Sequence, residues 1–414
     1  MLPSSPGSTP SWRERVRSIV EPAAVIVYTL TFTTFVLALC LLILTGNNAH
    51  GRDVVSFWAA GRQVVHHANP YDSGAIYQME KSVGFSSNSE DFIMRNPPTA
   101  LCLVMPLGYL GLRAANLLWS LLLLAALALS VYLLWRMLGR PDNKLHYLGY
   151  SFAPALFCIL SGQTALFALL GLVLFLRYHR ERPFIAGLSL WLCALKPHLF
   201  LPFAIVLLLW IVLHRSYRIL AGALLALGAS SLVAWHLDPA VWSQYAQMMH
   251  SSGIEREFIP CLAVALRFAL HSHRMVLQYI PAGVACLWAI RTYWLRRSSW
   301  DWMQDGALLM IVSILTGPYS WITDQALLIP ALLVGAYRAT TRMQLGLLML
   351  ASVVIEITPL AGKGMHSALY LWTTPFWFVW FLYVSNRRGA ESFPGSVERD
   401  GAAQREGLAQ NCSE

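Results

Sequence analysis

The chain has 414 residues, of which 57% are hydrophobic and only 12% are charged. Soluble domains carry about a quarter charged residues, so the composition excludes a water-soluble protein and predicts many apolar spans of ~20 residues. The net charge of +9 comes from arginines between apolar runs. That pattern is typical of cytoplasmic loops and excludes nucleic-acid binding as the main role.

In chain order, the sequence predicts a cytoplasmic segment at 1–21, a membrane domain at 22–386 and a disordered cytoplasmic tail at 387–414. An outer loop is expected at 47–97. Two apolar stretches, 97–111 and 259–270, are too short to span and are expected to be interfacial or re-entrant helices. The predicted spans are 23–45, 113–137, 146–160, 164–178, 184–195, 197–214, 217–237, 275–296, 303–318, 324–338, 343–360 and 367–386.

The fold class is therefore all-α and polytopic, with about twelve spans and a range of about 10 to 13. The positive-inside rule orients them. When the N-terminus is placed inside and the spans alternate, the arginine-rich turns fall on the inner side, and both termini are cytoplasmic. We expect a multi-pass protein of the plasma membrane whose unusual polar residues gather on the outer face.

The first candidate is Asp53, a few residues after the first predicted span. A carboxylate at the edge of an apolar region can have a pKa raised toward that of a useful general base. The alternative is a solvated loop aspartate. Arg62 and Tyr71 lie in the same outer loop, and Tyr71 stands in an N-P-Y-D sequence that by itself indicates only a turn.

Further candidates stand in short outer turns. Gln163, in S-G-Q-T, can donate and accept hydrogen bonds, although the segment also suits a tight helical hairpin. Lys196 and His198, in A-L-K-P-H-L, lie between apolar spans, where a lysine is costly and is a functional candidate. Lys196 either binds an anionic phosphate, snorkels to the interface, or is paired permanently with Asp53 or Asp324.

Tyr319 and Asp324 stand in P-Y-S-W-I-T-D-Q, where Asp324 is either a ligand or a cap at a helix N-terminus. His366 precedes the last span and is the least specific candidate. The sequence has no Walker loop, no G-x-G-x-x-G before a helix, no Asp-x-Asp pair and no Cys/His metal cluster. We therefore expect no cofactor, no metal and no binding site for a nucleotide donor.

Five segments of the chain form a pattern when they are taken in order: D-V-V-S-F-W-A-A-G-R with N-P-Y-D, then N-P-P-T-A-L-C-L-V-M-P-L, S-G-Q-T, L-K-P-H-L-F-L-P-F and P-Y-S-W-I-T-D-Q-A-L-L-I-P. Together they resemble glycosyltransferase family 87, and the resemblance extends over roughly residues 20–385. The sequence departs from the family in two places: Asn96 stands where an aromatic residue usually precedes Pro-Pro, and 251–260 follow the pattern only loosely.

The resemblance implies a GT-C helical bundle that moves a hexose, by analogy with known relatives mannose, from a polyprenyl-phosphate donor to a lipid or glycan hydroxyl. It implies that Asp53 is the general base and that the reaction inverts the sugar. Lys196 would then bind the donor phosphate, with the remaining candidates around the donor. Two other functions stay open: a secondary transporter that uses Asp53, Lys196 and Asp324 as a charge relay, and a non-catalytic assembly protein.

Overall fold

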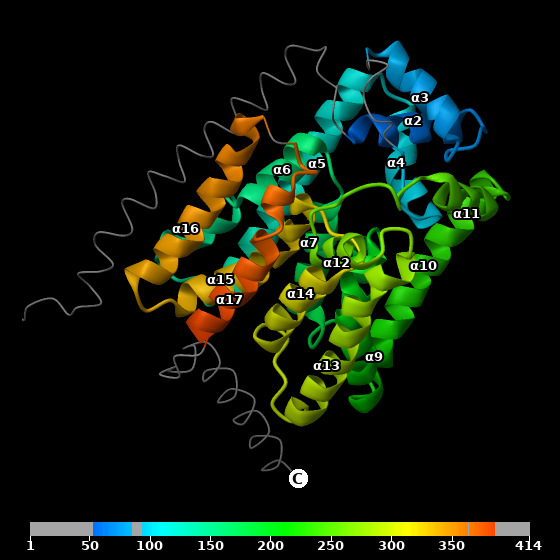
Figure 1. Cartoon of the computed structure of the whole chain (residues 1–414). Helices are drawn as coiled ribbons and strands as arrows, with labels where there is room; N and C mark the ends of the chain where they lie inside the picture. The colour runs from blue at the N-terminus through cyan, green and yellow to red at the C-terminus, as the bar shows by residue number, and fades with distance from the viewer. Residues whose placement is uncertain (1–52, 85–92, 363, 386–414) are drawn as a thin grey trace, which may run out of the picture.

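The computed structural model describes residues 53–84, 93–362 and 364–385, and every element within these ranges is a helix (Figure 1). The predicted first span at 23–45, the segments 1–21 and 387–414, and Lys363 lie outside the described residues.

Helices occur at each of the other predicted spans. Many of them contain a proline in the first turn, where its missing N–H costs nothing because that group has no partner within the helix. The helices are α5 Leu112–Met137, α6 Ala153–Ser161, α7 Ala165–Tyr178, α8 Pro183–Cys193, α9 Leu201–Leu213, α10 Tyr217–Leu237, α13 Ile280–Arg296, α14 Asp305–Thr316, α15 Ile329–Arg338, α16 Arg342–Ile357 and α17 Thr373–Ser385. Short 3₁₀ turns precede several of them, among them η2 Lys144–Gly149, η3 Pro197–Phe200, η4 Met275–Tyr279, η5 Ile322–Leu328 and η7 Ala368–Tyr370, and η6 Thr358–Ala361 follows α16.

The two short apolar stretches are also helical, as expected. The first is η1 Pro98–Ala100 continued by α4 Leu101–Gly108, and the second is α12 Leu262–Leu270. Three other helices were not predicted: α2 Val54–Val65 and α3 Ser73–Ser82 lie within the expected outer loop, and α11 Val241–Ser251 follows α10.

The unpredicted helices have local causes that hydropathy does not reveal. Asp72 caps α3 by accepting a hydrogen bond from the Ala75 N–H at 3.1 Å. Helix α2 buries Val54, Val55 and Phe57, and packs against α4. The expected loop is therefore a folded layer over one end of the bundle, at the upper right of Figure 1.

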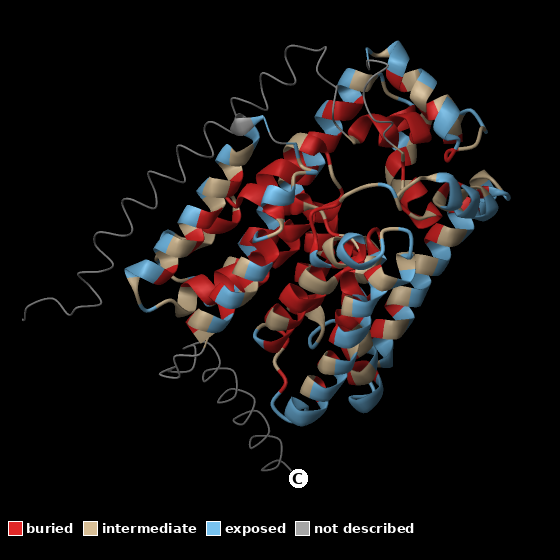
Figure 2. Ribbon diagram, in the orientation of Figure 1, coloured by how far each residue is buried: buried red, intermediate tan, exposed pale blue. Residues whose placement is uncertain are grey.

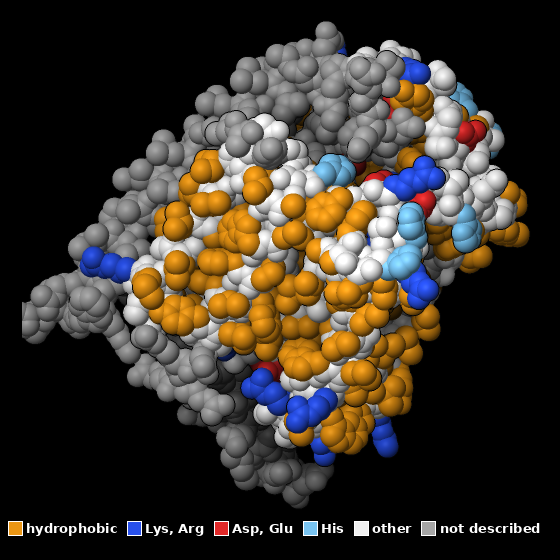
Figure 3. Space-filling model, in the orientation of Figure 1, with side chains coloured by type: hydrophobic (Ala, Val, Ile, Leu, Met, Phe, Trp, Pro, Cys, Tyr) orange, Lys and Arg blue, Asp and Glu red, His pale blue; other side chains and the backbone are white. Residues whose placement is uncertain are grey.

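The helices differ in whether they are long enough to cross a membrane. Among the described residues, three helical stretches are long and apolar enough to span: Leu112–Met137, Tyr217–Leu237 and Met275–Arg296. The others are shorter than the ~20 residues that a bilayer core requires. Buried residues line the interior of the bundle (Figure 2), and hydrophobic side chains cover much of the visible surface, with lysines and arginines mainly toward its ends (Figure 3).

The two ends of the bundle differ in chemistry. The turns before α7, η3 and η5 meet at the end where α2 lies, and they bring Gln163, Lys196 and Asp324 together. At the opposite end, the Arg296 Nη1 atom contacts the Asp305 Oδ1 atom at 2.5 Å, between the end of α13 and the start of α14. The turn that carries Arg296 and the turns that carry the three polar residues therefore lie at opposite ends of the bundle (Figure 1), and the orientation of these ends in a membrane stays a prediction.

Glycines allow α8 and α10 to cross in backbone contact. A Cβ atom added to Gly222 would lie 2.2 Å from the Phe184 carbonyl oxygen, and one added to Gly187 would lie 2.0 Å from the Ile219 carbonyl oxygen. Such distances are far below van der Waals contact, so no side chain fits between these helices. Small residues at crossings are the usual means by which membrane helices pack closely.

We expect Gly222→Ala to lower the stability of the protein by ~1–3 kcal/mol, because α8 and α10 must separate to admit the methyl group. The matched control is Gly228→Ala on the same helix, since nothing lies within 4 Å of an added Cβ there. That variant should be neutral or slightly stabilising, because alanine favours a helix by ~1 kcal/mol over glycine. Thermal unfolding in detergent measures both, and equal effects would contradict the proposed crossing.

Candidate functional site

The backbone around Asp53 is fixed by the turn between α6 and α7. Gly162 ends α6 with φ 79°, a left-handed conformation that suits glycine. Its carbonyl oxygen accepts a hydrogen bond from the Trp119 Nε1 atom at 2.7 Å. The Asp53 N–H donates to the Ser161 carbonyl oxygen at 2.7 Å. The S-G-Q-T segment therefore is a tight hairpin, and it also positions the start of α2.

Four predicted site residues form a continuous chain of hydrogen bonds, which we call the polar network. The Gln163 Nε2 atom donates to the Asp53 Oδ2 atom at 2.7 Å. The Lys196 Nζ atom donates to the Gln163 Oε1 atom at 2.8 Å and to the Asp324 Oδ1 atom at 2.6 Å. Asp53, Gln163, Lys196 and Asp324 come from four distant parts of the sequence and converge at one end of the bundle.

Lys196 and Asp324 form a buried ion pair within this network. The side chains are 10% and 1% exposed, respectively. The second oxygen of Asp324, Oδ2, accepts a hydrogen bond from the Trp321 N–H at 2.9 Å, so Asp324 also caps η5. Lys196 therefore has a carboxylate partner within the protein, as the alternative of a permanent pair requires. A donor phosphate is not needed to balance its charge.

The surroundings of Asp53 change the pKa of its carboxyl. Burial raises the pKa of its carboxyl from 3.8 to about 6, and the hydrogen bond from Gln163 together with the charges of Lys196 and Arg95 limits the rise. A carboxylate with such a pKa is a stronger base than an exposed aspartate and is still ionised at neutral pH. Its environment therefore suits proton abstraction.

A strap at residues 94–98 connects the turns that carry the network. The Asn96 Nδ2 atom donates to the Leu195 carbonyl oxygen at 3.0 Å and, more weakly, to the Thr164 Oγ1 atom at 3.4 Å. The Tyr71 hydroxyl donates to the Asn96 carbonyl oxygen at 2.9 Å. Tyr71 therefore supports the strap and does not contact the network directly.

The remaining predicted site residues make ring contacts outside the hydrogen bonds of the polar network. His198 and Tyr319 stack with ring centroids 3.8 Å apart, on the turns that carry Lys196 and Asp324. The His366 ring meets the edge of the Trp321 ring at 4.6 Å. Arg62 lies over the Trp58 ring at 5.5 Å, near the other end of α2, and is not part of this cluster.

Two charged residues near the network were not predicted. Arg95 forms a two-pronged ion pair with Glu257, with the Nη1 atom 3.0 Å from the Oε2 atom and the Nη2 atom contacting the Oε1 atom. Arg95 stands directly before N-P-P, a segment already singled out in the sequence, and this position could have identified it as a candidate. Glu257 lies 162 residues further on, in the segment where the family pattern is loose, and no local signal identifies it.

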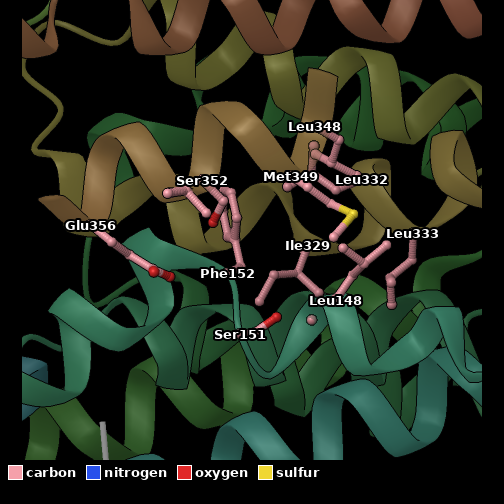
Figure 4. Close-up of a pocket in the computed structure, with 12 residues that line it drawn as sticks. Leu148, Ser151, Phe152, Ile329, Leu332, Leu333, Leu348, Met349, Ser352 and Glu356 are labelled. Carbon is pink, nitrogen blue, oxygen red and sulfur yellow. The ribbon is translucent and has the colours of Figure 1, made fainter. Parts of the chain in front are cut away.

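A separate groove lies between α15, α16 and the turn that leads from η2 into α6 (Figure 4). Its walls are mostly apolar and include Phe152, Ile329 and Leu348, with Ser352 and Glu356 as polar members. It contains none of the predicted site residues. Within the described ranges, His, Cys, Asp and Glu form no group of three or more that could hold a metal ion.

The fold and the site define a membrane protein that is helical in its described ranges and whose buried carboxylates and lysine meet at one end of the bundle. The chain belongs to glycosyltransferase family 87, whose family model matches residues 94–361. Gln163, Lys196 and Asp324 lie within the matched range, and Asp53 precedes it. Comparisons with curated proteins and with solved structures give no match. Membership in this family identifies the protein as a membrane glycosyltransferase and argues against a transporter.

Proposed function

We propose that this glycosyltransferase moves a hexose, with mannose as the first candidate, from a polyprenyl-phosphate donor to a hydroxyl of a lipid or glycan acceptor at the outer face of the plasma membrane. The observation that carries the proposal is the Asp53 carboxyl, whose pKa of about 6 and fixed position beside Gln163 suit a general base. A lipid-linked donor agrees with the apolar helices and needs no nucleotide site.

In the proposed reaction, Asp53 accepts the proton of the acceptor hydroxyl as its oxygen attacks the anomeric carbon. The bond between that carbon and the phosphate oxygen breaks, and the polyprenyl phosphate leaves with the electron pair. Attack opposite the leaving group inverts the anomeric centre. Gln163 orients the Asp53 carboxylate through its amide, and the ion pair of Lys196 and Asp324 fixes Gln163 from its other side.

The direct test incubates the purified protein with a panel of labelled polyprenyl-phosphate sugars and membrane-lipid acceptors. Transfer from at least one of these donors, with inversion at the anomeric carbon, is the expected result. Transfer only from nucleotide sugars would overturn the choice of donor. Retention of the anomeric configuration would overturn the role of Asp53 as a single base.

The pKa of Asp53 predicts a pH dependence. Only the ionised carboxylate accepts a proton, so kcat/KM should fall about tenfold per pH unit well below pH 6 and level off above it. Gln163→Leu removes a hydrogen bond that lowers the Asp53 pKa, so the acidic limb should move to higher pH. Initial rates from pH 4.5 to 8 measure both profiles, and an unchanged limb in Gln163→Leu would contradict this coupling.

A further inference from the structure

We infer that Arg95 binds the donor phosphate. When no donor is bound, the Glu257 carboxylate takes the place of the phosphate and pairs with the Arg95 guanidinium. This inference rests on the proposed function, since it assigns the phosphate of a polyprenyl-phosphate donor to a residue. It differs from the sequence-based expectation, which gave that role to Lys196.

Arg95 contacts Glu257 through two parallel hydrogen bonds, the arrangement in which an arginine also binds a phosphate. Both terminal nitrogens of the guanidinium contact both oxygens of the carboxylate. Phosphate oxygens accept the same two parallel hydrogen bonds from an arginine. Glu257 therefore stands where two oxygens of a phosphate monoester or diester fit.

The two ion pairs near the site differ in how readily they exchange partners. The side chains of Lys196 and Asp324 are almost fully buried, and both make additional hydrogen bonds within the protein. The side chains of Arg95 and Glu257 are each 25% exposed, and the Nε atom of Arg95 has no hydrogen-bond partner among the described residues. An anion arriving from outside can therefore replace Glu257 but not Asp324.

Arg95 also stands in the right place relative to the base. Its neighbour Asn96 is bonded to the Leu195 carbonyl oxygen beside Lys196 and to the Thr164 hydroxyl beside Gln163. The charge of Arg95 lowers the pKa of Asp53, so the guanidinium and the carboxyl lie within electrostatic range of each other. A phosphate held by Arg95 would therefore lie on the same side of the strap as the turns that carry Lys196 and Gln163, within electrostatic range of Asp53.

Glu257 lies in the connection between α11 and α12, which is not helical from residue 252 to 261. Arg267, fully buried in α12, holds this connection by donating from its Nη1 atom to the carbonyl oxygens of Glu255 and Ser272 at 2.6 and 2.5 Å. Because the backbone is fixed at Glu255, two residues before Glu257, exchange of the carboxylate for a phosphate on Arg95 requires only a rotation of the Glu257 side chain.

The test measures equilibrium binding of a short polyprenyl phosphate without sugar to the full chain in lipid nanodiscs. Arg95→Gln should weaken binding at least tenfold. Arg95→Lys should weaken it less, since lysine keeps the positive charge but cannot make the two parallel hydrogen bonds of a guanidinium. Glu257→Gln should tighten binding several-fold, because it removes the competing carboxylate. Melting temperatures of all three variants should stay close to that of the wild type.

A purely structural ion pair gives different results. Arg95→Gln and Glu257→Gln would then both lower the melting temperature by similar amounts, the charge reversal Arg95→Glu with Glu257→Arg would restore it, and binding in Glu257→Gln would not tighten. Those results would overturn the inference. If the wild type transfers sugar from a polyprenyl phosphate while Arg95→Gln binds that phosphate normally, the inference fails and the proposed function stands. If the wild type neither binds polyprenyl phosphate nor transfers from it, the proposed function fails.

Discussion

Asp53→Asn is expected to lose a factor of ~10²–10⁴ in the rate of sugar transfer, because an amide cannot accept the proton of the acceptor hydroxyl. Asparagine has nearly the same size and can still meet the Gln163 side chain after its amide rotates, so the fold should be retained. Single-turnover transfer from a labelled donor measures the loss. Melting temperature and expression should match those of the wild type.

The control for this variant is Asp72→Asn, in the same part of the chain. Asp72 is exposed and caps α3, and asparagine caps a helix about as well as aspartate. Its transfer rate should be unchanged. Turnover close to that of the wild type in Asp53→Asn would place the catalytic carboxylate elsewhere, and Asp324 would then be the next residue to test.

Lys196→Met is expected to lower the free energy of unfolding by ~3–5 kcal/mol, because it leaves the Asp324 carboxylate buried without its partner. The loss of Lys196 also removes a hydrogen bond to Gln163, so transfer should fall in the fraction that still folds. The measurement is thermal or denaturant unfolding in a fixed detergent, alongside the transfer rate.

Two further variants identify the cause of this loss. Lys144→Met removes an exposed lysine and should leave stability unchanged. Combining Lys196→Met with Asp324→Asn removes both buried charges while the asparagine oxygen can still accept the Trp321 N–H, so stability should recover most of the way. A stable Lys196→Met single variant with weakened donor binding would instead return Lys196 to the role of phosphate ligand.

The sequence allowed much of the helical pattern to be predicted because each span is an apolar run bounded by arginines, prolines or glycines. Hydropathy does not predict α2, α3 and α11, since caps such as Asp72 and packing against neighbouring helices stabilise them. The number of crossings and the orientation of the chain in the membrane stay predictions. So do the roles of the site residues in catalysis.

The sequence singles out the four residues of the polar network one by one but leaves open which of them pair. Asp53, Gln163, Lys196 and Asp324 stand out because polar groups beside apolar spans are rare. Which of them pair depends on how the helices pack, and Lys196 has Asp324 as its partner from a position 128 residues later in the chain. The contact between Arg95 and Glu257 joins two loops across 162 residues, so no periodicity or local motif reveals it.

The long sequence separations in the polar network also set the order in which it can form during synthesis. Asp53 and Gln163 are 110 residues apart and can meet once α6 and α7 have been made, whereas Lys196 must wait for Asp324. A nascent chain that ends before η5 therefore holds a lysine between apolar helices without a carboxylate, which is costly in a membrane. We expect ribosome-stalled chains ending before residue 324 to be recognised as incomplete by quality-control proteases, and longer ones to become resistant.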